Sequence, residues 1–116
     1  MKAVILLGHG SRDPLWREPM DAVASRVAAR GVAVRCAFVE LQEPDLAAAA
    51  AALVREGATH LTVVPLFLGA GRHARVDVPR MADDLRRTHE SLVIELRPFV
   101  GDDARVLDLL ASIASE

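Results

Sequence analysis

Two histidines and one glutamate have the side chains and the positions in the chain to bind a metal ion. His9 lies between two glycines, His73 follows a glycine-rich stretch, and Glu40 follows an apolar run. Imidazole nitrogens together with a carboxylate oxygen suit a borderline divalent ion such as cobalt, ferrous iron, nickel or zinc. No thiolates accompany them, which argues against a closed structural zinc site. Two or three protein ligands would leave coordination positions free for a metal that is handed on.

Four apolar runs predict the strands that must position these residues. They cover residues 3–7, 33–39, 61–65 and 92–96, and the first is continuous rather than alternating. A continuous run is typical of a parallel strand that is covered on both faces. Because a stretch with helical signals follows each run, we expect a three-layer α/β sandwich. Its four-stranded parallel sheet would have the common strand order 2-1-3-4.

In that order the first and third strands are neighbours, and ligands bind beyond the carboxyl ends of the strands. His9 and His73 would therefore share one edge of the sheet, together with Glu40 after the second strand. His60 precedes the third strand at the opposite edge, and His89 lies near the end of the third helix. We expect these last two histidines to be structural.

Proline, glycine and apolar spacing predict four helices. The first begins after Asp13-Pro14, is kinked or restarted by Pro19, and stops at Gly31. The others are expected over residues 44–57, 78–88 and 102–114. In the fourth, the apolar residues are expected to face inward: Leu107, Leu110 and Ile113.

The composition describes one modest globular domain over residues 1–116. Fourteen Lys and Arg stand against 16 Asp and Glu, the formal net charge is −2, and 52% of the residues are apolar. The basic residues are scattered, so nucleic-acid binding is not indicated. The single cysteine, Cys36, cannot form an internal disulfide, and no apolar run is long enough for a signal-peptide core or a membrane span. A soluble cytoplasmic protein is expected.

Four short motifs follow one another along the chain: LGHGSRDP at 7–14, VPLFL at 64–68, GRH at 71–73 and DVP at 77–79. Together they resemble the short cobalt chelatase and sirohydrochlorin ferrochelatase family. The resemblance implies a class II chelatase-like half-unit and an ATP-independent lyase that inserts a divalent metal into sirohydrochlorin, in cobalamin or siroheme biosynthesis. Cobalt is favoured, with ferrous iron or nickel as alternatives. The metal is then a substrate, and no tightly bound cofactor is expected.

Carried over residue by residue, the resemblance makes His9 and His73 catalytic residues and metal ligands. Glu40 corresponds to an acidic position associated with the metal, with Glu43 close by as the alternative. Metallation releases two pyrrolic protons while a dication enters, so the site needs both metal ligands and proton acceptors. Neutral histidines perform either task, and the sequence leaves open which histidine performs which.

Sirohydrochlorin is rich in carboxylates, which guanidinium groups bind well. The candidate substrate-binding residues lie beside the histidines: Ser11, Arg12, Arg72 and Arg75. An apolar wall beneath the macrocycle could come from Trp16, Phe67 and Leu68. Longer members of the family resemble two copies of this domain in tandem. The resemblance therefore implies a homodimer, with a twofold interface that completes the cleft.

Two other functions compete with this interpretation. A histidine phosphatase needs an arginine directly before its first-loop histidine, and Gly8 stands there instead. A non-catalytic metal or tetrapyrrole carrier would use the same ligands and stays open. An ATP-driven chelatase is disfavoured because the chain has no G-x-x-x-x-G-K-[ST] loop.

Overall fold

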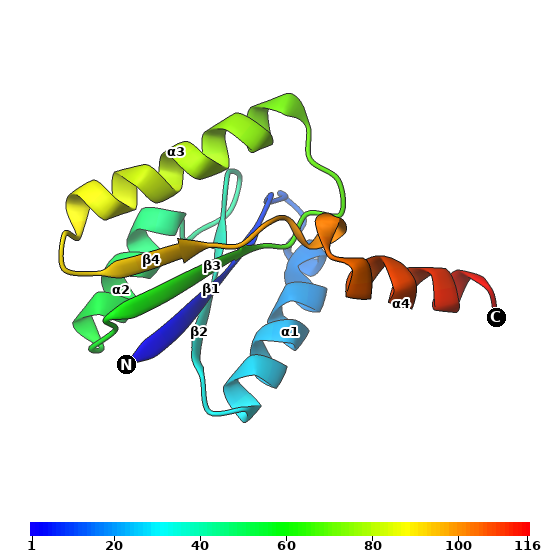
Figure 1. Cartoon of the computed structure of the whole chain (residues 1–116), viewed down its shortest axis with the longest axis horizontal. Coiled ribbons are helices and arrows are strands. Elements are labelled where there is room, and N and C mark those ends of the chain that lie inside the picture. Colours follow the sequence, from blue (N-terminus) through cyan, green and yellow to red (C-terminus); the bar gives the residue numbers. More distant parts are fainter.

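A computed structural model describes residues 1–116, with one four-stranded parallel sheet and four α-helices (Figure 1). The strands are β1 (Lys2–Gly8), β2 (Ala33–Phe38), β3 (His60–Pro65) and β4 (Val93–Leu96). The helices are α1 (Glu18–Ala29), α2 (Leu46–Arg55), α3 (Arg72–Thr88) and α4 (Ala104–Ala114), with short 3-10 helices η1 (Pro14–Arg17) and η2 (Val100–Asp102). The strand order β2-β1-β3-β4 confirms the predicted topology.

The larger core lies between the sheet and the helices α2 and α3. Alternate residues of β1 point into it, so that Ile5 and Leu7 pack with Leu46 of α2 and Val78 of α3. Parallel pairing aligns the carboxyl ends of the strands, with Gly8 opposite Phe38 and Leu7 opposite Pro65. The loops that follow β1, β2 and β3 therefore begin side by side.

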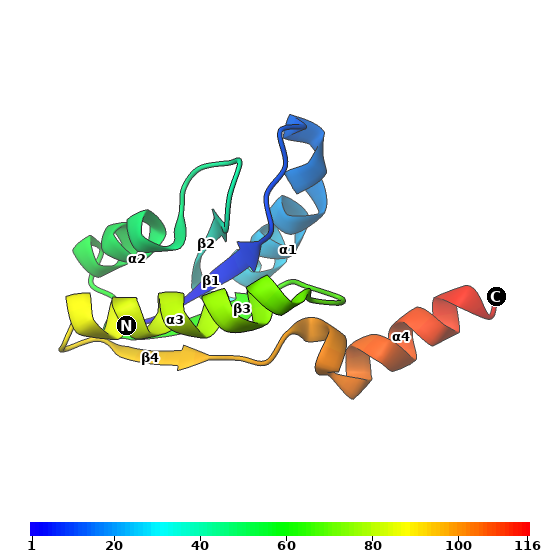
Figure 2. The ribbon, with the colours of Figure 1, turned by 90° about the horizontal axis from the view of Figure 1, so that it is seen from above.

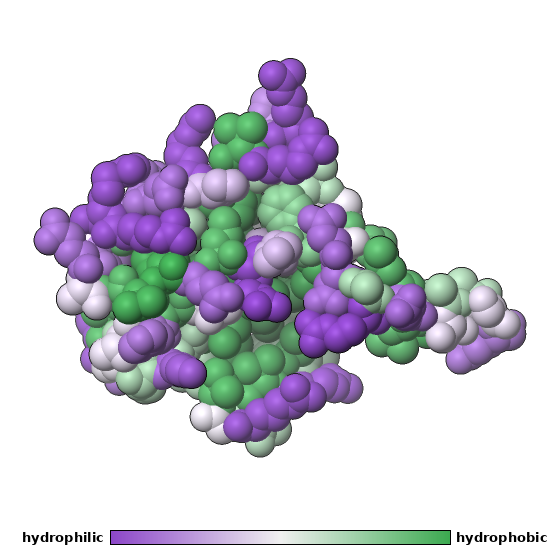
Figure 3. All heavy atoms as spheres, in the orientation of Figure 1, coloured by the Kyte–Doolittle hydropathy of each residue, from purple (hydrophilic) through white to green (hydrophobic).

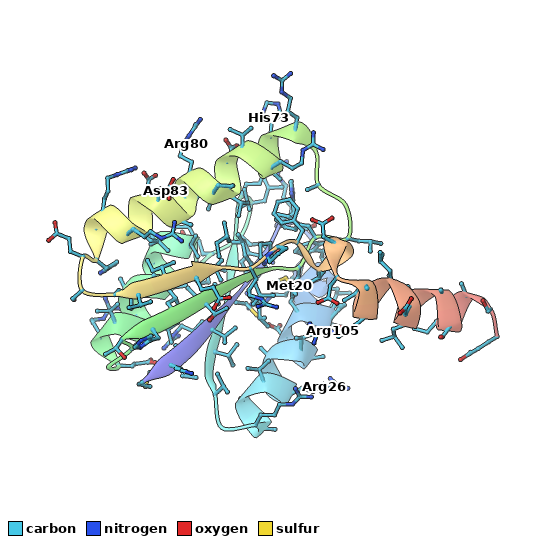
Figure 4. All side chains as sticks on the ribbon, in the orientation of Figure 1. Met20, Arg26, His73, Arg80, Asp83 and Arg105 are labelled. Atoms are coloured by element: carbon cyan, nitrogen blue, oxygen red, sulfur yellow. The ribbon has the colours of Figure 1, made fainter.

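Helix α1 alone covers the other face of the sheet. The intervening side chains Leu6, Cys36 and Phe38 pack there against Met20, which points from α1 toward the sheet (Figure 4). Viewed from above, α1 lies beside β1 and β2, and β4 lies at the far edge (Figure 2). Burial raises the pKa of the Cys36 thiol, which disfavours the reactive thiolate.

The predicted helix boundaries hold for α1 and α2. Pro19 restarts the helix in the first turn of α1 after η1, and the Asp45 carboxylate accepts the Ala48 N–H at the start of α2. The predicted start of the third helix at residue 78 is wrong, because α3 begins at Arg72 and runs through Pro79. A proline removes one helical hydrogen bond, and the buried residues Val78 and Ala82 hold the helix together around it.

The expectation that the fourth helix faces inward is also wrong. Helix α4 projects from the body and lengthens the molecule to 47 Å (Figures 1 and 2). The side chains of Leu107, Leu110 and Ile113 are 48%, 41% and 56% exposed. Periodicity shows that a helix has an apolar face, but it does not show what covers that face. None of the helices has the length and apolar character needed to cross a membrane.

Candidate functional site

The ends of β1 and β2 place His9 beside Glu40. Backbone pairing continues past the strands, since the Val39 N–H donates to the Gly8 carbonyl at 3.0 Å and the Glu40 N–H to the His9 carbonyl at 3.1 Å. The His9 Nε2 atom lies 3.2 Å from Glu40 Oε1. Both side chains are more than half exposed, at 56% and 57%, so a ligand can approach them. Glu43 makes no such contact with His9, which favours Glu40 as the acidic residue of the site.

Gly10 allows the two loops to come this close. Its φ is +105°, and a Cβ atom there would lie 1.7 Å from the Glu40 carbonyl oxygen. A side chain at this position would therefore be strained and would collide with backbone. Gly10 keeps the His9 loop against the Glu40 loop.

Gln42 joins the same two loops through its side chain. The Ser11 N–H donates to Gln42 Oε1 at 3.0 Å, and the Gln42 N–H donates to the Glu40 carbonyl at 2.8 Å. The Ser11 hydroxyl oxygen accepts the Asp13 N–H at 3.1 Å, which leaves its proton free to donate. The sequence analysis missed Gln42, because only the acidic neighbours in its loop suggested metal chemistry.

His73 lies in the first turn of α3 and shares a cavity with His9. The cavity has a volume of about 440 Å³, and its other lining residues are Phe67, Gly69, Ala70, Gly71 and Ala74. The His9 and Phe67 rings meet edge-on with centroids 6.0 Å apart, and Phe67 packs in turn on Phe99 at 5.4 Å. The predicted pairing of the two histidines at one sheet edge is therefore present, on an aromatic support.

The three candidate metal ligands do not converge on one point. Glu40 contacts His9 but does not line the cavity that His9 shares with His73. No group of three or more His, Cys, Asp or Glu side chains is close enough to hold a metal ion. One chain thus presents a two-histidine cavity with a carboxylate at its rim.

Three exposed arginines at this edge make no ion pair: Arg12, Arg72 and Arg75. Figure 4 shows His73 at the start of α3, with Arg80 and Asp83 further along the helix. The guanidinium groups at the start of the helix are free to bind anions.

The candidate apolar wall divides into a buried and an exposed part. Phe67 is buried and supports His9, whereas Leu68 is 62% exposed and Trp16 is 40% exposed. The Trp16 ring leans on Phe38 with centroids 6.3 Å apart. Leu68 and Trp16 are therefore the members of this group that offer apolar surface to a ligand.

The remaining histidines lie away from this edge. His60 begins β3 at the opposite end of the sheet, where its Nδ1 atom is 3.1 Å from the Thr59 hydroxyl. His89 ends α3, where its N–H donates to the Leu85 carbonyl. Both positions agree with the prediction that these residues are structural.

Comparison with known proteins gives consistent matches in sequence. The profile of the CbiX family matches residues 3–116. A sirohydrochlorin cobaltochelatase from Sulfolobus acidocaldarius is 32% identical over 116 residues, which is all of this chain and 92% of the relative. A sirohydrochlorin ferrochelatase from Bacillus subtilis is 33% identical over 108 residues, which is 91% of this chain and 41% of the relative. Several other cobaltochelatases match over 58% to 64% of their length.

Solved structures match over the whole fold. A cobalamin (vitamin B12) biosynthesis CbiX protein from Marinobacter aquaeolei has a TM-score of 0.86 and 33% identity, and the match covers 99% of this chain and 93% of that one. The sirohydrochlorin chelatase SirB from Bacillus subtilis subspecies spizizenii, in complex with cobalt, has a TM-score of 0.82 and 29% identity. That match covers 98% of this chain but 50% of SirB.

Proposed function

The chain belongs to the CbiX family, and from that premise we propose that it is a sirohydrochlorin chelatase. It is an ATP-independent lyase that inserts a divalent metal into the tetrapyrrole in cobalamin or siroheme synthesis. The observation that carries the proposal is the cavity lined by His9 and His73, with Glu40 against His9. Cobalt is the favoured metal, with ferrous iron or nickel as alternatives, and the names of the relatives support the first two.

The geometry favours different roles for the two histidines. Metal insertion exchanges one dication for two protons of the macrocycle. His9 accepts the two protons one after the other, and the Glu40 carboxylate at 3.2 Å orients its ring and passes each proton on to solvent before the next is taken. His73 has no carboxylate partner and presents the metal from the other side of the cavity. Glu40 then acts through His9, because it contacts His9 and does not line the cavity.

The free cations and exposed apolar groups of this edge fit the other features of the substrate. Arg12, Arg72 and Arg75 bind the carboxylates around the macrocycle, and the free hydroxyl proton of Ser11 donates to one of them. Gly71 starts α3 without a side-chain cap, so the amides of the first turn also favour an anion. Leu68 and Trp16 contact the apolar face of the ring.

Residues 1–116 act in this proposal as one chelatase domain, and two copies complete the cleft as a homodimer. The match to half of SirB supports this arrangement, because one SirB chain is about as long as two copies of this one. A cytoplasmic location belongs to the same proposal, in keeping with the free, buried thiol of Cys36.

The test is a visible-absorbance time course of anaerobic sirohydrochlorin with cobalt or ferrous iron and limiting protein. We expect several turnovers per chain above the rate without protein, and loss of this rate in the His9→Ala, His73→Ala double variant. His60→Ala is the matched control, since it removes a histidine from the opposite edge. Full activity of His9→Ala would overturn the site assignment. Spectral changes that stop at one equivalent would support the carrier function instead.

A further inference from the structure

Leu41 combines two properties that do not help the fold. It is the only residue other than glycine with a positive φ, at +66°, and its side chain is 54% exposed. A leucine rarely adopts this left-handed backbone conformation, because its Cβ atom crowds the following carbonyl group, whereas glycine and asparagine adopt it more easily. The exposed apolar side chain gains nothing from burial in return. A conformational outlier of this kind is typical of a functional site.

The strain at Leu41 comes from a γ-turn in the loop that follows β2. The Gln42 N–H donates to the Glu40 carbonyl two residues earlier at 2.8 Å, and Leu41 with its positive φ is the central residue. This form of the γ-turn is the rare and strained one. Leu41 directly follows Glu40, whose carboxylate lies 3.2 Å from His9 Nε2. The strained residue is therefore next to the site.

Hydrogen bonds on both sides hold the turn in place. The Phe38 N–H donates to the Pro44 carbonyl at 2.9 Å and closes the loop at its base. The Gln42 side chain accepts the Ser11 N–H from the loop after β1, which lies beside this one (Figures 1 and 2). The surroundings thus fix the conformation of Leu41 against its own backbone preference.

The turn directs Leu41 away from its own loop. The loop encloses a cavity of about 390 Å³, and every residue of 38–45 lines this cavity except Leu41. An apolar side chain in an unstrained loop is expected to pack into such a cavity rather than to stand in water. The γ-turn instead holds the leucine side chain outside, where a ligand at the edge of the sheet can contact it.

The loops that carry Leu41 and Leu68 flank the loop of His9. In the sheet, β2 and β3 pair with β1 on either side, and neighbouring strands lie about 4.8 Å apart. The ends of β2 and β3 are thus about 10 Å apart, a span that a tetrapyrrole macrocycle can bridge. Leu68, after β3, is 62% exposed. One exposed leucine therefore follows each strand that neighbours the His9 strand.

The helix that borders this edge offers mainly charge to a ligand. Figure 3 shows mostly hydrophilic surface along α3. At the start of this helix, Arg72 and Arg75 make no ion pair. Ligand sites for large organic molecules combine such polar groups with a greater area of apolar contact. At this edge, the loops after the strands supply that apolar contact.

We propose that Leu41 is a substrate-contacting residue that packs against the apolar face of sirohydrochlorin and keeps the macrocycle over His9, opposite Leu68. This role rests on the proposed function and adds a specificity-determining residue to its site. The γ-turn orders the side chain before the substrate arrives, so binding does not have to supply that ordering. Burial of the exposed half of a leucine side chain corresponds to about a five- to tenfold gain in affinity.

Titration of the protein with metal-free sirohydrochlorin, followed by absorbance, measures binding without metal insertion. Leu41→Asn fits the positive φ but loses the apolar contact, so we expect Kd to rise about five- to tenfold. Leu41→Met keeps an apolar side chain of similar volume and should bind within about twofold of wild type. Val23→Ala is the matched control, because it truncates an exposed apolar side chain of α1 and should leave Kd unchanged. Equal Kd values for wild type and Leu41→Asn, or an equal loss in Leu41→Met, would overturn the contact.

Unfolding and kinetics separate this contact from a structural role. Leu41→Asn should have a Tm equal to or above that of wild type, because asparagine relieves the backbone strain. Its KM for sirohydrochlorin should rise while kcat stays within about twofold and KM for cobalt is unchanged. A lower Tm together with a lower kcat would show that Leu41 only holds Glu40 in place, and would overturn the proposal.

The binding titration also separates this role from the chelatase activity. Wild-type protein that does not bind sirohydrochlorin would overturn both the role of Leu41 and the proposed function. Binding without turnover would overturn the chelatase activity alone, and the ratio of the Kd values of wild type and Leu41→Asn would still decide the role of Leu41.

Discussion

The two ends of α3 carry the same residue types in different surroundings. At its start, Arg72 and Arg75 make no ion pair, whereas further along Arg86 and Arg87 are each paired with the aspartate three residues before them. Each end also has a histidine: His73 lines the cavity with His9, and His89 ends the helix outside it. Exposed ion pairs contribute little stability, so their main effect is to cancel charge along the helix. Within α3, the positive charge that remains without an ion-pair partner therefore lies at the start of the helix, beside His73.

The helix caps show the same division. Asp45 and Asp103 accept backbone N–H groups at the starts of α2 and α4, whereas Gly71 gives α3 no side-chain cap. The first amides of α3 therefore remain available to an anionic ligand. The start of α3 carries the unpaired charges and uncapped amides that the proposed function assigns to substrate binding, whereas the rest of the helix carries ion pairs and the buried residues that pack on the sheet.

The largest expected difference between the two ends concerns their histidines. We expect His73→Ala to lower the catalysed rate of metal insertion about 100-fold or more, because it removes a group that acts on the metal or a proton. His89→Ala should leave the rate within about twofold, since His89 lies outside the site. Initial rates with cobalt and sirohydrochlorin measure both. Equal losses of rate in the two variants would contradict the proposal that only the start of α3 belongs to the site.

Gly10 and Gly57 both have positive φ, but only Gly10 also lies in close contact with backbone. Gly10→Ala should destabilise the protein by about 2 kcal/mol or more, because of its positive φ and its contact with the Glu40 carbonyl. Gly57→Ala, at φ +104° with open space around it, should cost about 1 kcal/mol. Denaturant unfolding measures both, and a Gly57 effect as large as that of Gly10 would contradict the role of the contact.

The arginines at the start and at the end of α3 are expected to differ in their effect on substrate binding. Arg72→Gln together with Arg75→Gln should raise KM for sirohydrochlorin about tenfold with a small change in kcat, since charge-assisted bonds contribute about 1.5 kcal/mol or more. Arg86→Gln together with Arg87→Gln should leave KM unchanged. A similar rise in KM for both pairs would point to general electrostatic attraction rather than to a local site.

The smallest effect concerns the cap of α4. Side-chain and backbone hydrogen bonds with Arg105 lower the pKa of Asp103 from 3.8 to about 2. Because the carboxyl group of Asp103 has a lower pKa in the folded than in the unfolded chain, its ionised form stabilises the fold. This stabilisation is complete above pH 3.8 and is lost as the pH falls through about 2. The difference in Tm between wild type and Asp103→Asn should therefore be present at pH 5 and vanish toward pH 2. Asp45→Asn is the control, since Asp45 caps α2 without an arginine partner. A difference that does not change with pH would show that the charge of Asp103 contributes nothing.

The sequence alone predicted most of the framework. Strand patterns and the helical stretches between them indicated four parallel strands, and the order 2-1-3-4 followed from the common topology of such a sheet; the structure confirms both. Because parallel strands end at one edge, that order also placed His9 and His73 together. The early start of α3 was missed, because residues 72–77 follow a glycine-rich stretch, which is typical of a loop; buried contacts of Val78 and Ala82 compensate for Pro79 inside the helix.

The fine geometry of the site depended on contacts between loops. Gly10 approaches the Glu40 carbonyl closely, and the Ser11 N–H donates a hydrogen bond to Gln42 Oε1. These contacts join distant parts of the chain, and Glu40 does not line the cavity of His9 and His73. Local residue patterns carry no information about such distances.

What the sequence determined by itself was periodic and local: the strands, the capped helices, the residue types at the sheet edge and the apolar face of α4. Only the tertiary structure decided which loops touch, that the two histidines share a cavity which Glu40 does not line, and where α4 points. The direction of α4 follows from the backbone contact of Gly101 with Leu68, fixed by packing between segments more than 30 residues apart. Secondary structure is encoded by neighbours in the chain, whereas the site and its approaches are set by neighbours in space.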